Sequence, residues 1–153
     1  MVDIYLIRFN NPHVEDIAIK RIKKYTDVPY SLHIYDNWGK KESVSSLWNR
    51  WLRGAKNPVV FINSDAYVCK GWLGEMLKYL TENVVAVGPS GNVVGEQAEI
   101  KTRDDVKKHE YPSKEVSYVS GYCMLVKDVG IYFPEELPLY HNEIAWQALT
   151  SLD

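Results

Sequence analysis

The sequence has few of the features that mark secreted, membrane-spanning or disulfide-rich proteins. Only two of its 153 residues are cysteines, Cys69 and Cys123, and both lie in apolar stretches where a reduced thiol packs as a small hydrophobe. No apolar run approaches the ~20 residues that cross a bilayer, and no charged and then apolar leader precedes Val2. These absences predict a cytoplasmic protein without a transmembrane segment.

The sequence also lacks a strong charge of either sign. Eighteen basic and 20 acidic residues give a formal net charge of −2, which offers no reason to expect nucleic acid as a partner. The one basic cluster, at positions 20–24, is typical of a solvated helix face. The length suits a single domain spanning residues 1–153.

Apolar runs with strand character alternate with segments of helical periodicity. Helices are predicted after Asn11, which offers an N-cap, after Ser43, which offers another, and after Gly71. Residues 90–115 lose the apolar pattern and are predicted to form a surface loop. The alternation indicates an α/β fold, with a mostly parallel sheet between two layers of helices. Strands are predicted at residues 3–9, 31–35, 59–62, 84–89 and 116–127.

Two of the predicted strands end in polar residues. The strand at 59–62 leads into Asn63, Ser64 and Asp65, and the strand at 31–35 leads into Asp36. Ligands of open α/β sheets bind outside the carboxyl ends of the strands, so we expect Asp36 and Asp65 to leave neighbouring parallel strands at one edge. The alternative for each carboxylate is a local turn, which Asp and Asn commonly start.

The segment after the strand at 59–62 resembles the metal-binding motif of family 2-like glycosyltransferases with the GT-A fold. The resemblance lies in Asn63, Ser64 and Asp65, followed by Lys70–Leu73 and an amphipathic helix. The resemblance implies a three-layer α/β/α sandwich with a nucleotide-binding half, 1–89, and an acceptor-side half, 90–153. It further implies a nucleotide-diphospho-sugar donor, with Asp65 binding Mn²⁺ or Mg²⁺ and Asp36 accepting a hydrogen bond from the base. The acceptor would be an unknown glycan, lipid or protein, and a homodimer is compatible with the sequence.

The same resemblance extends to residues elsewhere in the chain. Glu143 matches the general base of inverting members, and His141 beside it could complete the metal site with Asp65. For Glu143 the alternative is an ordinary acidic residue in the first turn of a helix capped by Asn142. Asn49 could face the donor or could be an ordinary helix-surface residue. Gly121 could let a sugar approach the backbone or could mark a bulge between two strand pieces. The residues predicted to lie near the donor are Phe9, Asn10, Asp36, Asn49, Asn63, Asp65 and Gly121.

The sequence departs from the family pattern in three places, which leaves rival functions open. Asn63 stands where the family has a carboxylate, Glu143 lacks an adjacent Asp, and the chain ends at Asp153, soon after the expected base. A non-catalytic sugar-nucleotide-binding or assembly module on the same fold would look similar. A nucleotidyltransferase is a third candidate, although no Gly-rich phosphate loop follows the first strand.

Overall fold

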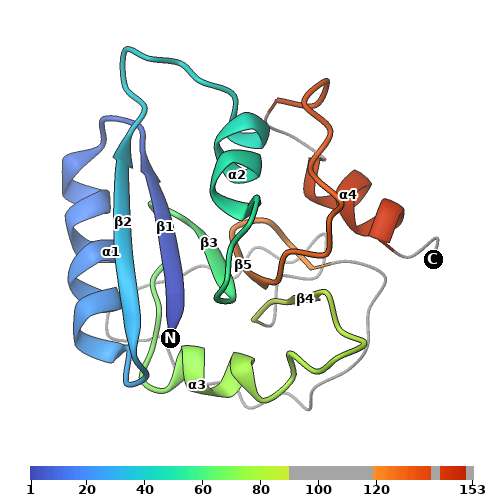
Figure 1. Ribbon diagram of the computed structural model, residues 1–153. Helices are drawn as coiled ribbons and strands as arrows, with labels where there is room; N and C mark the ends of the chain where they lie inside the picture. Colours follow the sequence, from blue (N-terminus) through green and yellow to red (C-terminus); the bar gives the residue numbers. More distant parts are fainter. Residues whose placement is uncertain (90–118, 139–141, 151–153) are drawn as a thin grey trace, which may run out of the picture.

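The computed structural model of the protein describes residues 1–89, 119–138 and 142–150, and Figure 1 shows their arrangement. Within these ranges the chain forms five strands and four helices. In chain order the elements are β1 (Val2–Arg8), α1 (Pro12–Tyr25), β2 (Tyr30–Asp36), α2 (Val44–Leu52), β3 (Val59–Asn63), α3 (Trp72–Leu77), β4 (Ala86–Val87), β5 (Cys123–Val126) and α4 (Asn142–Thr150).

The five strands form one mixed sheet in the order β2-β1-β3-β5-β4. β1 is parallel to both β2 and β3, whereas β5 is antiparallel to both β3 and β4. Four strands therefore run in one direction, which confirms the predicted α/β class and mostly parallel sheet. The expectation that Asp36 and Asp65 leave neighbouring strands is wrong, because β1 lies between β2 and β3.

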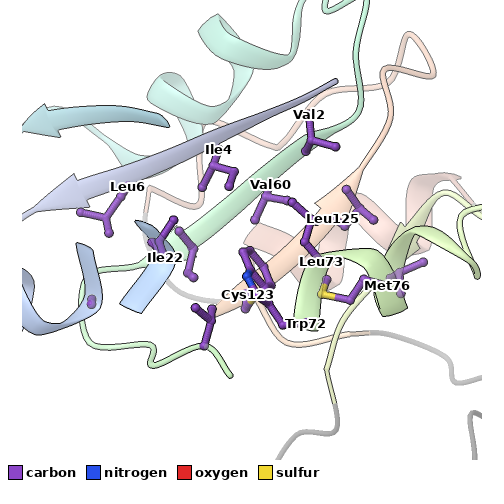
Figure 2. Close-up of a cluster of buried hydrophobic side chains, with 14 residues drawn as sticks. Val2, Ile4, Leu6, Ile22, Val60, Trp72, Leu73, Met76, Cys123 and Leu125 are labelled. Atoms are coloured by element: carbon purple, nitrogen blue, oxygen red, sulfur yellow. The ribbon is translucent and has the colours of Figure 1, made fainter. Parts of the chain in front are cut away.

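Helices cover both faces of the sheet. On one face, α1 and α3 pack against alternate residues of β1 and β3, such as Ile4 and Val60, in the cluster drawn in Figure 2. On the other face, α2 and α4 pack against the intervening positions, such as Phe61, through Trp48 and Trp146. The two clusters follow from the period of two along a strand, which sends successive side chains to opposite faces.

Several elements are shorter than their apolar patterns predict. The apolar stripe after Gly71 extends to Leu80, but α3 ends at Leu77, where tight turns begin. The run at 84–89 supplies only the two-residue β4. Residues 90–118 lie outside the described residues, so the predicted loop at 90–115 and the start of the last predicted strand cannot be compared. None of the described helices is long and apolar enough to cross a membrane.

Candidate functional site

β1, β2 and β3 end at one edge of the sheet, and β5 begins there. The register sets Arg8 opposite Asp36 and Ile7 opposite Asn63. The backbone N–H of Asn63 donates to the carbonyl oxygen of Tyr122, just before β5, at 2.8 Å. We call this edge, defined by Arg8, Asp36, Asn63 and Tyr122, the sheet rim. Adjacent strands are ~4.8 Å apart, so the ends of β2 and β3 lie about 10 Å from one another across β1.

Asp36 is exposed at the sheet rim and also forms a local turn. Its Oδ1 accepts a hydrogen bond from the backbone N–H of Trp38 at 3.0 Å. The turn that the sequence allowed as an alternative is therefore present, and it fixes the carboxylate at the end of β2. The turn also carries Trp38, whose side chain is 64% exposed.

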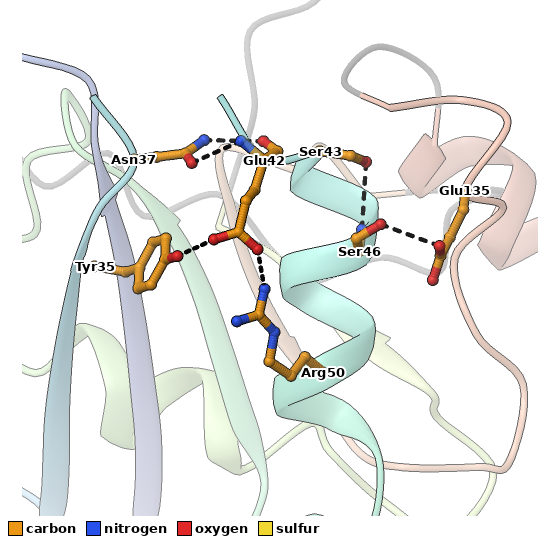
Figure 3. Close-up of polar contacts among 7 residues, drawn as sticks. All are labelled: Tyr35, Asn37, Glu42, Ser43, Ser46, Arg50 and Glu135. Carbon is orange, nitrogen blue, oxygen red and sulfur yellow. Dashed lines mark hydrogen bonds and ion pairs between the residues drawn. The ribbon is translucent and has the colours of Figure 1, made fainter. Parts of the chain in front are cut away.

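The loop between β2 and α2 is held by two side chains that the sequence analysis did not single out. The buried amide of Asn37 donates to the carbonyl of Glu42 and accepts from its N–H, each at 2.9 Å. The Glu42 carboxylate accepts a hydrogen bond from the Tyr35 hydroxyl and pairs with Arg50 of α2 (Figure 3). These hydrogen bonds, from Tyr35 and then Arg50, lower the pKa of Glu42. Strand β2 and helix α2 are thereby joined beside Asp36.

The loop from β1 to α1 brings Phe9 and Asn10 to the sheet rim. Both are exposed, and Asn10 has a left-handed backbone with φ 69°. The loop is organised by Glu15, whose buried carboxylate accepts from Arg8 Nε at 2.8 Å and from the backbone N–H groups of Phe9 at 2.7 Å and Asn11 at 3.2 Å. Asn11 precedes α1 as predicted but makes no side-chain cap.

The electrostatics of Glu15 follow from these contacts. Burial opposes its ionisation, but the hydrogen bonds from Arg8, Phe9 and Asn11 outweigh burial and hold the pKa of Glu15 below its ordinary value. Two backbone donors of the β1–α1 loop are thus used by a carboxylate of the chain itself. This role of Glu15 was not predicted, because a first-turn Glu normally complements the helix dipole at the surface.

Asn63 and Asp65 lie on the turn between β3 and α3. Both are exposed, and the backbone N–H of Ala66 donates to the Asn63 carbonyl at 3.1 Å, closing the turn. Gly71 follows with φ 76°, a left-handed conformation that suits glycine, immediately before α3. The turn presents the Asp65 carboxylate outward at the end of a central strand of the sheet.

Of the two predicted cation ligands, Asp65 lies within the described residues and His141 lies outside them. Residues 1–89, 119–138 and 142–150 contain no group of three or more His, Cys, Asp or Glu side chains that could hold a metal. Mg²⁺ is commonly bound through one or two carboxylates together with substrate phosphates. The residues present therefore fit a cation shared with a phosphate ligand better than a cation held by protein groups alone.

Gly121 and Glu143 lie against each other next to the sheet rim. A methyl group added at Gly121 would lie 3.3 Å from Cγ and Cδ of Glu143 and 3.3 Å from the ring of Trp48. Asn142, the first residue of α4, is buried; it donates to Ser45 Oγ at 2.9 Å and accepts from the Glu143 N–H at 3.0 Å. Gly121 therefore leaves room for Glu143, and Asn142 fixes the start of its helix onto α2.

Asn49 is buried, and its side-chain polar atoms bond the segment before α4 rather than groups of the sheet rim. It donates to the Phe133 carbonyl at 2.9 Å and to Glu135 Oε1 at 3.1 Å, and it accepts from the Phe133 N–H at 2.7 Å. The helix-surface alternative is wrong, because only 3% of Asn49 is exposed. Helical periodicity places Asn49 off the main apolar stripe of α2 but cannot show that another segment covers it.

At the sheet rim, Asp36 and Asn63 end β2 and β3, whereas Phe9, Asn10 and Asp65 lie on the loops that follow β1 and β3. Gly121 lies just before β5, against Glu143 in the first turn of α4. Comparisons with protein-family models, curated proteins and solved structures find no match.

Proposed function

We propose that the protein is a metal-dependent glycosyltransferase of the GT-A type that moves a sugar from a nucleotide-diphospho-sugar to an acceptor hydroxyl. The main support is the register that ends β2 and β3 at one rim, with Asp36 and Asn63 on either side of β1. In this proposal Asp65, two residues beyond Asn63, acts on the same extended ligand as Asp36. Helices on both faces of the sheet also support the proposal, because the resemblance implies helices on both sides of the sheet.

Asp36 is assigned to the base of the donor. One of its oxygens accepts from Trp38, and the other carboxylate oxygen can accept from the N–H edge of a nucleobase. The exposed rings of Phe9 and Trp38, 47% and 64% exposed, stand on the two loops that flank this position and offer surfaces for stacking. Asp36 would therefore give selectivity, while the aromatic rings would give affinity.

Asp65 is assigned to the divalent cation, with Asn63 on the same turn as a neutral oxygen donor. When bound, Mn²⁺ or Mg²⁺ offsets the negative charge that builds on the departing diphosphate. The amide of Asn63 is a weaker donor than a carboxylate, so we expect the protein to bind the cation weakly without a diphosphate.

Glu143 is assigned to deprotonate the acceptor hydroxyl, which gives inversion at the sugar carbon. Glu143 lies at the start of α4 against Gly121. The carbonyl of the neighbouring Tyr122 accepts a hydrogen bond from the backbone N–H of Asn63, on the turn that carries Asp65. The sugar would therefore lie between the turn of Asp65 and the carboxylate of Glu143. A general base acts within hydrogen-bond reach of its proton, which a bound acceptor must provide here.

The proposal is tested by following hydrolysis and transfer of UDP-, GDP-, CMP- and dTDP-sugars with and without Mn²⁺. We expect turnover of at least one donor, loss of that turnover in Asp65→Ala, and little change in Asp16→Ala, a matched removal of an exposed carboxylate on α1. Circular dichroism checks that both variants fold. Unchanged turnover in Asp65→Ala contradicts the assignment of the cation.

A non-catalytic binding module is the second candidate, favoured by Asn63 in place of a carboxylate. It predicts donor binding without turnover and without dependence on Mn²⁺. A ligand at about 100 times its dissociation constant adds about 2.7 kcal/mol of apparent stability, which thermal unfolding detects. The nucleotidyltransferase alternative is less well supported, because Glu15 already occupies two backbone donors of the loop after β1.

A further inference from the structure

β2 lies at the outer edge of the sheet, and the described residues leave its outer side without a paired strand. All seven residues of β2 pair with β1 on the inner side in an unbroken register. Figure 1 shows no described strand beside its outer side. Natural proteins protect such edges with lysine, proline or bulges, and Tyr30–Asp36 contains none of these.

The hydrogen bonds to β1 show which backbone groups point to this free edge. The N–H of Asn37 donates inward to Arg8 at 3.1 Å, and the carbonyl of Pro29 accepts inward from Val2 at 3.0 Å. Backbone groups of alternate residues point to opposite sides of a strand, so the odd-numbered residues of β2 face β1. The N–H and C=O groups that point outward belong to Tyr30, Leu32, Ile34 and Asp36.

We propose that a second copy of this chain pairs with β2 in an antiparallel manner about a two-fold axis at His33. This register is the one centred within β2 that pairs all seven residues of both strands. It sets Leu32 opposite the partner's Ile34, and Tyr30 opposite the partner's Asp36. The apolar pair is favourable because Ile34 is 43% exposed in the single chain, and the carboxylate meets a hydroxyl rather than another charge.

Charges on the neighbouring helix support the same orientation. α1 packs on the face of the sheet that carries Leu32, with Asp16 exposed near its start and Lys23 and Lys24 exposed in its last turn. The two-fold axis makes the two copies of α1 antiparallel. The acidic start of one helix then lies toward the basic end of the other. The helix dipoles are also antiparallel, so that opposite partial charges of the two helices lie side by side.

The size of the contact predicts a weak dimer. Two seven-residue strands and the flanks of two helices bury less than the ~800 Å² per partner of a standard stable interface, so we expect dissociation in the micromolar to millimolar range. The contacts lie along β2 and include Asp36, which is also assigned to the nucleobase, but they do not use Asp65 or Glu143. Dimerisation is measured below without any donor, so its outcome can be distinguished from that of the turnover assay.

Disulfide trapping tests the register directly. The two-fold axis makes residue 33 face its own copy as a non-hydrogen-bonded pair, whose Cα atoms are ~4.5 Å apart, within the range of a disulfide. In a Cys69→Ser background, His33→Cys should form a covalent dimer under oxidising conditions. Ser31→Cys is the matched control, because its two copies would lie about four residues, or ~13 Å, apart.

Sedimentation equilibrium over a concentration series measures the dimer without a cross-link. We expect the unmodified chain to dimerise as concentration rises and Ile34→Lys to shift the dissociation constant at least tenfold upward. Tyr79→Lys, a substitution at a site 41% exposed on another surface, should leave dimerisation unchanged. A chain that stays monomeric up to about 1 mM overturns the inference, as does equal cross-linking of the two cysteine variants.

Discussion

The buried side chain of Asn49 provides the sharpest test of the packing between α2 and the segment that leads to α4. It satisfies both backbone groups of Phe133, a residue only 2% exposed and stacked on Trp146 at 4.8 Å. Asn49→Ala leaves a buried N–H and a buried C=O without their partner. Each such group costs about 1–3 kcal/mol, so the free energy of unfolding should fall by about 2–6 kcal/mol.

The assay is urea unfolding with thermal unfolding in parallel. For a domain of this size 1 kcal/mol corresponds to about 2–4 °C, so we expect a fall in Tm of roughly 4–24 °C. Ser46→Ala is the control, because Ser46 lies one turn earlier on α2 and bonds the exposed carboxylate of Glu135 at 3.1 Å; it should change stability by less than about 0.5 kcal/mol. Asn49→Ala with unchanged stability but lost donor binding would refute the structural role and restore Asn49 as a ligand residue.

Three further predictions concern single side chains. Because the pKa of Glu15 is lowered, its contribution to stability is complete above the ordinary carboxyl pKa of 4.5 and is lost as pH falls through the folded-state pKa. In Glu15→Gln the free energy of unfolding should therefore fall less steeply with decreasing pH below about pH 4.5 than in the unmodified protein. Parallel plots of the free energy of unfolding against pH for the two proteins would contradict this. Burial raises the pKa of Cys123 to about 12, so a thiol reagent should label Cys69 in the folded protein and reach Cys123 only after unfolding. Gly121→Ala should displace Glu143 and lower kcat about tenfold or more while changing stability by less than about 2 kcal/mol, and unchanged kcat would argue against Glu143 as the base.

Polar residues at the ends of strands could be predicted from the sequence. Apolar runs that stop at Asp36 and Asn63 predicted both the strand ends and their placement on a common edge, because parallel strands bring their carboxyl ends together. Ser43 likewise caps α2 as predicted, accepting from the N–H of Ser46 at 3.3 Å. Such features depend on residues close in the chain, so a local pattern is enough to find them.

The sequence was uninformative where a contact joins distant segments. The position of β5 between β3 and β4, antiparallel to both, depends on packing across the sheet, and no local pattern specifies it. The burial of the polar side chains Glu15 and Asn49 was not predicted for the same reason. Periodicity identifies the apolar face of a helix, but it does not reveal which polar side chains another segment will cover.

In the proposed function one ligand joins the loops after β2 and β3, with its diphosphate and a cation at Asp65. Paramagnetic broadening by Mn²⁺ measures this directly in a backbone amide NMR spectrum, recorded with and without a nucleoside diphosphate. We expect trace Mn²⁺ to broaden the signals of residues 63–66 selectively only when the nucleotide is present, and we expect Asp65→Ala to remove this broadening. Nucleotide-dependent broadening centred away from the sheet rim, or none at all, would contradict the proposal.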